Sequence, residues 1–234
     1  MASLVHADLV VVNTGDNLDG YVDASDANSD DIADGGIASL THTESFDIAG
    51  VMFDLSFDLL AGGGFFNGRA DDMGIWSNTD TESPSRQNAF LAPRNETIEL
   101  RNVAISNVSG GTAVFNGITS VGLDSAAGAD DEGEFVIPGN VISWTSSSPF
   151  FVGGDLDGTA SGDRTFDLLG GNGGTPVSGF LLRTVGANLD NSFRLDAVEF
   201  DVAVTAVPDA SSLVLFACGA AGVGARLRRR RRAV

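Results

Sequence analysis

The chain has 234 residues, enough for one domain with a substantial core, and its 13 basic and 32 acidic residues give a net charge of −19. Six of the basic residues lie within 226–232, so the rest of the chain carries a charge near −25, which excludes nucleic-acid binding by the body of the protein. Its one cysteine, Cys218, excludes an internal disulfide, so the fold must depend on core packing, with or without a metal ion.

Residues 1–7 resemble the end of a secretory signal. Val5 and Ala7 occupy the small-residue positions that precede a cleavage point, and Asp8 would then begin the mature chain. We therefore expect residues 1–7 to be the remnant of an export signal. The same stretch also fits the beginning of a first strand, and the sequence leaves both interpretations open.

An acidic segment near the N-terminus has the spacing of a calcium loop. Its oxygen ligands fall at alternating positions, as they do around a hard cation: Asp26, Asn28, Asp30, the backbone of Ile32, and Asp34. A full EF-hand is rejected, because Asp31 stands where glycine is needed and Ile37 stands where a bidentate Glu would complete the shell. The segment predicts a looser structural Ca²⁺ site, and the alternative is a solvated acidic linker.

The body of the chain, residues 8–206, has the pattern of an all-β domain. In 51–59, apolar and polar residues alternate, which indicates a half-buried strand. Turn-forming clusters separate further predicted strands at 9–12, 37–41, 74–76, 97–105, 112–121, 134–137, 141–145, 164–169, 179–185 and 192–204. No stretch of the body gives a long amphipathic helix, so we predict a β-sandwich, and within that class a jelly roll.

The last predicted strand changes phase along its length. Its apolar positions have odd numbers up to Leu195 and even numbers from Val198 onwards. A bulge near Asp196 and Ala197 would bring both sets to the same face. A long closing strand of this kind resembles the final strand of galactose-binding-like and other carbohydrate-binding jelly rolls.

Two tryptophans have different surroundings. Trp76 is followed by Ser77 and Asn78, which favours an exposed aromatic platform for a glycan, although tryptophans more often pack than stack on sugars. Trp144 lies among the apolar residues of a predicted strand, which is typical of the core.

The sequence gives little support for catalysis. Its two histidines are His6 and His42, and no metalloprotease, hydrolase, phosphate-binding or dinucleotide-binding spacing occurs in a suitable context. We therefore predict a protein that is not an enzyme. The alternative is a glycoside-active enzyme, because its two carboxylates can be distant in the sequence.

The C-terminal segment, 207–234, has three parts in a fixed order. A polar motif comes first: Val207, Pro208, Asp209, Ala210, Ser211 and Ser212. An apolar stretch, 213–225, follows, and then a cluster that would stay on the cytoplasmic side of a membrane: Arg226, Arg228, Arg229, Arg230, Arg231 and Arg232. The order predicts a transmembrane sorting helix. The alternative is a buried core helix followed by a basic tail, since apolar runs of about 10–14 residues are more often core than membrane.

The motif, the apolar stretch and the arginine cluster together resemble the bacterial PEP-CTERM sorting signal. Two positions depart from the main pattern, because Asp209 stands where Glu is usual and Ala210 where a second Pro is usual; the start of the motif is similar to the related VPDSG-CTERM variant. The resemblance implies that an exosortase removes the helix and passes the body to the cell surface or its exopolysaccharide matrix.

These observations predict an exported bacterial protein of the cell envelope, cell surface or extracellular matrix. We expect transient anchoring in the inner membrane, and partners that include an exosortase and exopolysaccharide but no nucleic acid. The body is expected to have a binding or structural role that calcium supports. The alternative is a secreted glycoside-active enzyme on the same scaffold.

Overall fold

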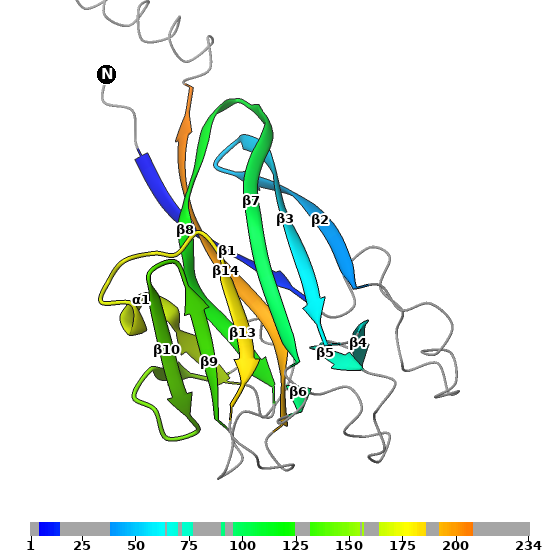
Figure 1. Cartoon of the computed structure of the whole chain (residues 1–234). Helices are drawn as coiled ribbons and strands as arrows, with labels where there is room; N and C mark the ends of the chain where they lie inside the picture. Colours follow the sequence, from blue (N-terminus) through cyan, green and yellow to red (C-terminus); the bar gives the residue numbers. More distant parts are fainter. Residues whose placement is uncertain are drawn as a thin grey trace, which may run out of the picture.

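Two antiparallel β-sheets pack face to face, which confirms the predicted all-β sandwich (Figure 1). The computed structural model describes residues 5–14, 38–63, 65–69, 72–76, 90–91, 96–124, 132–154, 156, 164–185 and 192–207. Among these residues, no helix is long and apolar enough to cross a membrane. The predicted sorting helix, 213–225, lies outside them.

The six-stranded sheet forms the front layer in Figure 1, with the strand order β10-β9-β13-β7-β3-β2. Every neighbouring pair in it is antiparallel. Its strands are β2 (Ser39–Ile48), β3 (Val51–Gly62), β7 (Thr97–Ser109), β9 (Glu132–Ile137), β10 (Asn140–Thr145) and β13 (Phe180–Thr184).

The eight-stranded sheet lies behind it, in the order β11-β12-β8-β14-β5-β4, with β1 and β6 also paired to β14. Its strands are β1 (Val5–Asn13), β4 (Phe65–Arg69), β5 (Asp72–Trp76), β6 (Phe90–Leu91), β8 (Gly111–Asp124), β11 (Phe151–Gly153), β12 (Arg164–Asp167) and β14 (Ser192–Ala206). The sequence pattern did not predict β4, β6 and β11.

One predicted strand was two residues too long at its C-terminal end. The strand expected at 164–169 ends at Asp167, and the helical turn α1 (Leu168–Gly171) begins there. Asp167 caps this turn, because its Oδ1 accepts a hydrogen bond of 2.6 Å from the backbone N–H of Gly170.

Aromatic contacts join the inner faces of the two sheets. The rings of Phe57 in β3 and Phe200 in β14 are 5.4 Å apart, and those of Phe135 in β9 and Phe166 in β12 are 4.8 Å apart. Trp144 is only 2% exposed, which confirms its prediction as a core residue. The core therefore lies between the sheets, where the apolar residues of each alternating strand point.

The phase change in β14 is a bulge at the predicted place. The register with β8 shifts between Leu195 and Ala197, which leaves Asp196 as the extra residue. Leu195 and Val198 are consequently both buried in the core. Thr14 secures the bulge, because its N–H donates to the Asp196 carbonyl at 2.8 Å and its hydroxyl lies 2.8 Å from the carbonyl oxygens of Leu195 and Asp196.

The two ends of the described chain lie together on β14. β1 begins at Val5, opposite Thr205, and β14 ends at Ala206. Val207 then donates its N–H to the carbonyl of Gly110 in the turn between β7 and β8, at 2.9 Å. Whether residues 1–7 also belong to an export signal stays a prediction.

Gly133 tests how tightly the core is packed around Trp144. A Cβ added at Gly133 would overlap the Trp144 indole, and it would lie 3.0 Å from the Arg183 carbonyl oxygen. We expect Gly133→Ala to lower the free energy of unfolding by about 1–3 kcal/mol, because neither the indole nor the backbone has room to move away. Urea denaturation would measure it. The matched control is Gly154→Ala, where no atom lies within 4 Å, and an equal loss in both variants would contradict the prediction.

Candidate functional site

The side chains on the outer face of the six-stranded sheet form rows that run across the strands. The strand register places one row from β10 to β2, in the order Val141, Val136, Leu181, Glu99, Leu60 and Ser39. The apolar members are Val141, Val136, Leu181 and Leu60, and we call them the apolar row. Val136, Leu181 and Leu60 are only partly buried and Val141 is exposed, so this row offers apolar surface to solvent on both sides of Glu99.

A second row, which we call the polar row, lies beside the apolar row and consists of Arg101, Asp58 and Thr41. Oδ1 of Asp58 accepts a hydrogen bond of 2.6 Å from the hydroxyl of Thr41. Nη1 of Arg101 lies 3.6 Å from Oε1 of Glu99, and both side chains are substantially exposed, at 47% and 38%. The two rows together place apolar surface next to hydrogen-bonding groups.

Two bulges in β7 place asparagines against β3. Asn102 and Asn107 have φ values of 56° and 51°, in the left-handed region that Asn tolerates better than most residues. Each lies where the register of β7 with β3 shifts by one residue. Nδ2 of Asn102 donates to Oδ2 of Asp58 at 2.7 Å, and Nδ2 of Asn107 donates to Oδ2 of Asp54 at 2.6 Å.

The same three-residue arrangement thus occurs twice. Asp54 also accepts a hydrogen bond of 2.6 Å from the hydroxyl of Ser45 on β2, as Asp58 does from Thr41. We call Thr41, Asp58 and Asn102 the Asp58 triad. We call Ser45, Asp54 and Asn107 the Asp54 triad. Each links a hydroxyl on β2, a carboxylate on β3 and an amide at a bulge of β7.

The triads favour the ionised form of both carboxyl groups. The hydrogen bond from Ser45, and then that from Asn107, lowers the pKa of Asp54 below its ordinary value. The hydrogen bond from Thr41, then that from Asn102, lowers the pKa of Asp58, and the charge of Arg101 adds to the effect. In both cases partial desolvation acts in the opposite direction and is weaker.

Two depressions lie on this face, and Arg101 lines both. The larger, of about 530 Å³, lies over β7, β13 and β9, and its lining includes Asn102, Leu181 and Pro138. The smaller, of about 270 Å³, lies over β2 and β3, and its lining includes Asp58. We call the two depressions together the Arg101 groove. The larger one has a volume within the range of small-ligand sites, about 300–1,000 Å³.

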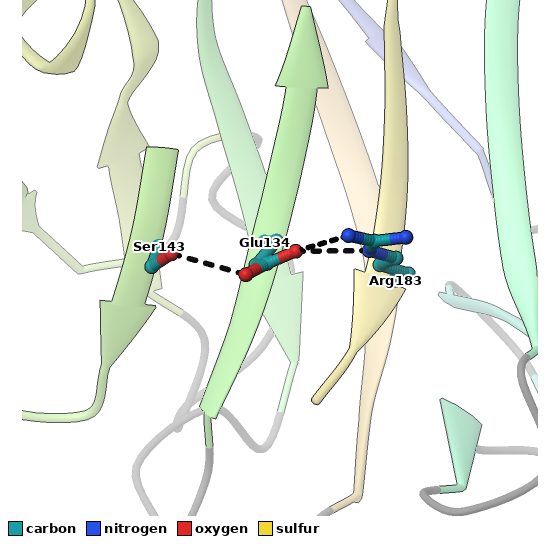
Figure 2. Close-up of polar contacts among 3 residues, drawn as sticks. All are labelled: Glu134, Ser143 and Arg183. Carbon is teal, nitrogen blue, oxygen red and sulfur yellow. Dashed lines mark hydrogen bonds and ion pairs between the residues drawn. The ribbon is translucent and has the colours of Figure 1, made fainter. Parts of the chain in front are cut away.

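A salt bridge borders the apolar row on its other side. Figure 2 shows Glu134 on β9 between Arg183 on β13 and Ser143 on β10. Oε2 of Glu134 accepts from Nε and Nη2 of Arg183, at 2.9 and 2.6 Å, and Oε1 accepts from the Ser143 hydroxyl at 3.1 Å. Glu134 is two residues before Val136 on β9, and Arg183 is two residues after Leu181 on β13. Because side chains two residues apart on a strand point to the same face, Glu134 and Arg183 lie on the same face as the apolar row.

Most residues that the sequence singled out lie outside this face. The predicted calcium ligands Asp26, Asn28, Asp30 and Asp34 and the sorting motif after Val207 are outside the described residues. Within the described part of the chain, no group of three or more His, Cys, Asp or Glu side chains could hold a metal ion. Trp76, predicted to bind a glycan, ends β5 opposite Phe65, and its side chain is also outside the description.

His42 contributes to the core. It is 4% exposed and its ring lies 5.4 Å from that of Phe57. Its Nε2 atom is 3.7 Å from Oε2 of Glu44. No nucleophile is bonded to it among the described residues, so its position is that of a packed side chain.

The Arg101 groove was not predicted from the sequence. A partial signal existed, since Asp54, Ser56 and Asp58 alternate on the outer face of a strand whose other face is apolar. The partners of these residues on β2 and β7 depend on the sheet register, which the sequence pattern does not supply. No protein-family model, curated protein or solved structure matches this chain, so its function is argued from its residues and geometry.

The lowered pKa values predict how the triads respond to acid. Above the pKa of an unfolded Asp, about 3.9, the hydrogen-bonded carboxylates stabilise the folded state. As the pH falls through their lower folded-state pKa values, this contribution is lost. We therefore expect the double variant Asp54→Asn, Asp58→Asn to melt a few degrees below the wild type at pH 6, with the difference shrinking below pH 4.

Thermal melts between pH 6 and pH 2 would measure this. Asp47→Asn is the control, since the Asp47 carboxylate lies outside both triads and caps the turn at Gly50. A difference between wild type and double variant that stays constant over the whole pH range would contradict the prediction.

Proposed function

We propose that the protein is exported and acts at the cell surface or in the extracellular matrix, with its β-sandwich body attached or released through the C-terminal segment. The observation that carries the proposal is the place where β14 ends. This strand is paired with β8 up to Ala206, and the motif at 207–212 follows without a linker. A folded domain followed directly by a polar motif, an apolar stretch and an arginine cluster supports sorting by that segment.

For the body we propose a binding or structural role rather than catalysis. An open groove with apolar and hydrogen-bonding rows supports binding, and His42 is packed in the core. We also propose the jelly-roll form of the sandwich. It is supported by sheets in which most neighbouring strands are distant in sequence, and by the crossing of the chain from one sheet to the other at Gly110.

The alternative of a glycoside-active enzyme has one feature in its favour, because Glu99 and Glu134 stand on the same outer face. Two carboxylates can act as acid and as base or nucleophile on a glycosidic bond. Release of reducing sugar from a polysaccharide, abolished by Glu99→Gln or Glu134→Gln, would identify the enzyme. Retention on the polysaccharide without release supports the binding role.

Deletion of residues 207–234 tests the location. In a bacterium that carries an exosortase, we expect the full chain in the envelope or outside the cell, and the truncated chain to be lost from the envelope fraction. A matched control replaces the six arginines of 226–232 by Gln, which removes the stop-transfer charge and keeps the length. If cell fractionation finds the full chain in the cytosol, unaffected by either change, the proposal is wrong.

Calcium binding by the acidic segment is the second part of the proposal. Asp26, Asn28, Asp30 and Asp34 carry oxygen ligands at alternating positions, and a bound Ca²⁺ would offset the repulsion among them. At a calcium concentration of about 100 Kd, binding to the folded state adds about 2.7 kcal/mol to its stability. We expect the melting temperature to rise with CaCl₂ and to fall with EDTA.

The double variant Asp26→Ala, Asp30→Ala should lose this response, and Asp47→Ala on β2 should keep it. Titration calorimetry of the wild type with CaCl₂ provides the direct measurement. No heat, together with a melting temperature that is the same in CaCl₂ and EDTA, would remove calcium from the proposal.

A further inference from the structure

We propose that the Arg101 groove binds an internal segment of a neutral polysaccharide, which lies across the strands of the six-stranded sheet. This inference rests on the proposed function, since a surface or matrix protein meets such polymers. It goes further by assigning the site, the chemical class of the ligand and the direction in which it runs.

The shape of the groove favours a chain over a single sugar. Arg101 lines a depression of about 530 Å³ towards β9 and one of about 270 Å³ towards β2. The apolar row runs from Val141 in β10 to Leu60 in β3, across five strands, which at a spacing of about 4.8 Å is about 19 Å. An elongated track on an open face accommodates several consecutive sugar rings, whereas a terminal sugar is usually enclosed by a closed pocket.

The chemistry of the rows matches the two kinds of surface on a sugar ring. Half-buried Val136, Leu181 and Leu60 can cover the apolar C–H face of a ring. Arg101 and Glu99 offer donors and acceptors to neighbouring hydroxyls. Nη1 of Arg101 and Oε1 of Glu99 are 3.6 Å apart, which is beyond hydrogen-bond distance. The ion pair between them therefore leaves the Nη1 donor and the Oε1 acceptor able to bond to a ligand.

The charges on this face favour a neutral ligand. The arginines Arg101 and Arg183 each have a glutamate within ion-pair distance. Asp54 and Asp58 add negative charge, and the chain outside its C-terminal arginine cluster is strongly acidic. A polymer of uronic acids would meet net repulsion, whereas the hydroxyls of a neutral polymer can bond to guanidinium and carboxylate alike.

The Asp58 triad is assigned a positioning role. Asn102 follows Arg101 directly, and its hydrogen bond to Asp58 holds the bulge of β7 next to Arg101. The Asp54 triad has the same chemistry on the same three strands, but none of its members lines either depression. It therefore serves as a matched control, because breaking either triad removes the same kinds of hydrogen bond.

The experiment is affinity electrophoresis of the full chain, kept soluble in a mild non-ionic detergent, in native gels that contain one polysaccharide each. The neutral polymers are hydroxyethylcellulose, mixed-linkage β-glucan, xylan, galactomannan and dextran. The acidic polymers are alginate and polygalacturonate. The variants are Arg101→Ala, Arg101→Lys, Asp58→Ala and Asp54→Ala, and a thermal melt of each shows whether it folds.

We expect at least one neutral polymer to retard the wild type and neither acidic polymer to do so. Arg101→Ala should weaken binding at least about tenfold, because it removes charge-assisted hydrogen bonds. Arg101→Lys keeps the charge without the planar fork and should bind with intermediate strength. Asp58→Ala should bind about threefold more weakly or worse, and Asp54→Ala should bind within about twofold of the wild type while melting at a similarly lowered temperature.

Three results would overturn the proposal: no retention by any neutral polymer, retention by the acidic polymers alone, or equal retention of the wild type and both Arg101 variants. Equal weakening in Asp58→Ala and Asp54→Ala would overturn the positioning role. The result of this binding experiment can be distinguished from the result of the test of location. A chain that reaches the cell surface but is retained by no neutral polymer disproves the groove assignment and leaves the proposed location standing.

Discussion

The contact between the inner faces of the two sheets is the interaction on which the rest of the structure depends. Phe57 and Phe200 meet across it in the middle of β3 and β14, and both are almost fully buried. The charge outside the arginine cluster opposes compaction, and the single cysteine excludes an internal disulfide. Apolar burial between the sheets must therefore supply the favourable free energy, and each strand must keep its apolar side chains on the inner face.

Bulges would break that requirement if their extra residues were not accommodated, and the four bulges in β7 and β8 are accommodated in the same way. β7 has two bulges and β8 has two, where its register with β14 shifts. At each, a polar side chain donates a hydrogen bond to a carboxylate on the adjacent strand: Asn102 to Asp58, Asn107 to Asp54, Thr119 to Glu199 and Asn116 to Asp201. Part of the acidity of the chain thus serves the sheets themselves, because these carboxylates bind the residues that the ladder leaves unpaired.

The sequence alone predicted what depends on the two-residue period of a strand. The alternation in 51–59 and the phase change before Val198 led to β3 and to the bulge at Asp196. The same reasoning would have located the bulge at Asn102. The inward residues before it, Ile98 and Leu100, have even numbers, and the inward residues after it have odd numbers. The turn α1 was missed because Leu168 and Leu169 continue an apolar run that periodicity cannot assign.

The groove could not be predicted in this way, because it depends on pairing between segments that are distant along the chain. Leu181 reaches Glu99 and Val136 only through the register of β13 with β7 and β9. The pattern within each segment says which face a residue occupies, but not which residue lies beside it. The sequence therefore indicated the residue types of the site, alternating carboxylates and hydroxyls on one strand, but not the position of the site.

The direction of the groove is related to the position at which the C-terminal segment begins. β14 ends at the same end of the sandwich as the β2–β3 and β7–β8 turns (Figure 1). A domain held at that end by a membrane segment has its strands directed away from the membrane, and the rows of the outer face, which cross the strands, then run parallel to the membrane surface. A polymer of the surrounding matrix can lie along the apolar row in that orientation without turning towards the bilayer. The proposed anchoring segment and the groove are thus compatible, because the segment directly follows a strand and the groove crosses five strands.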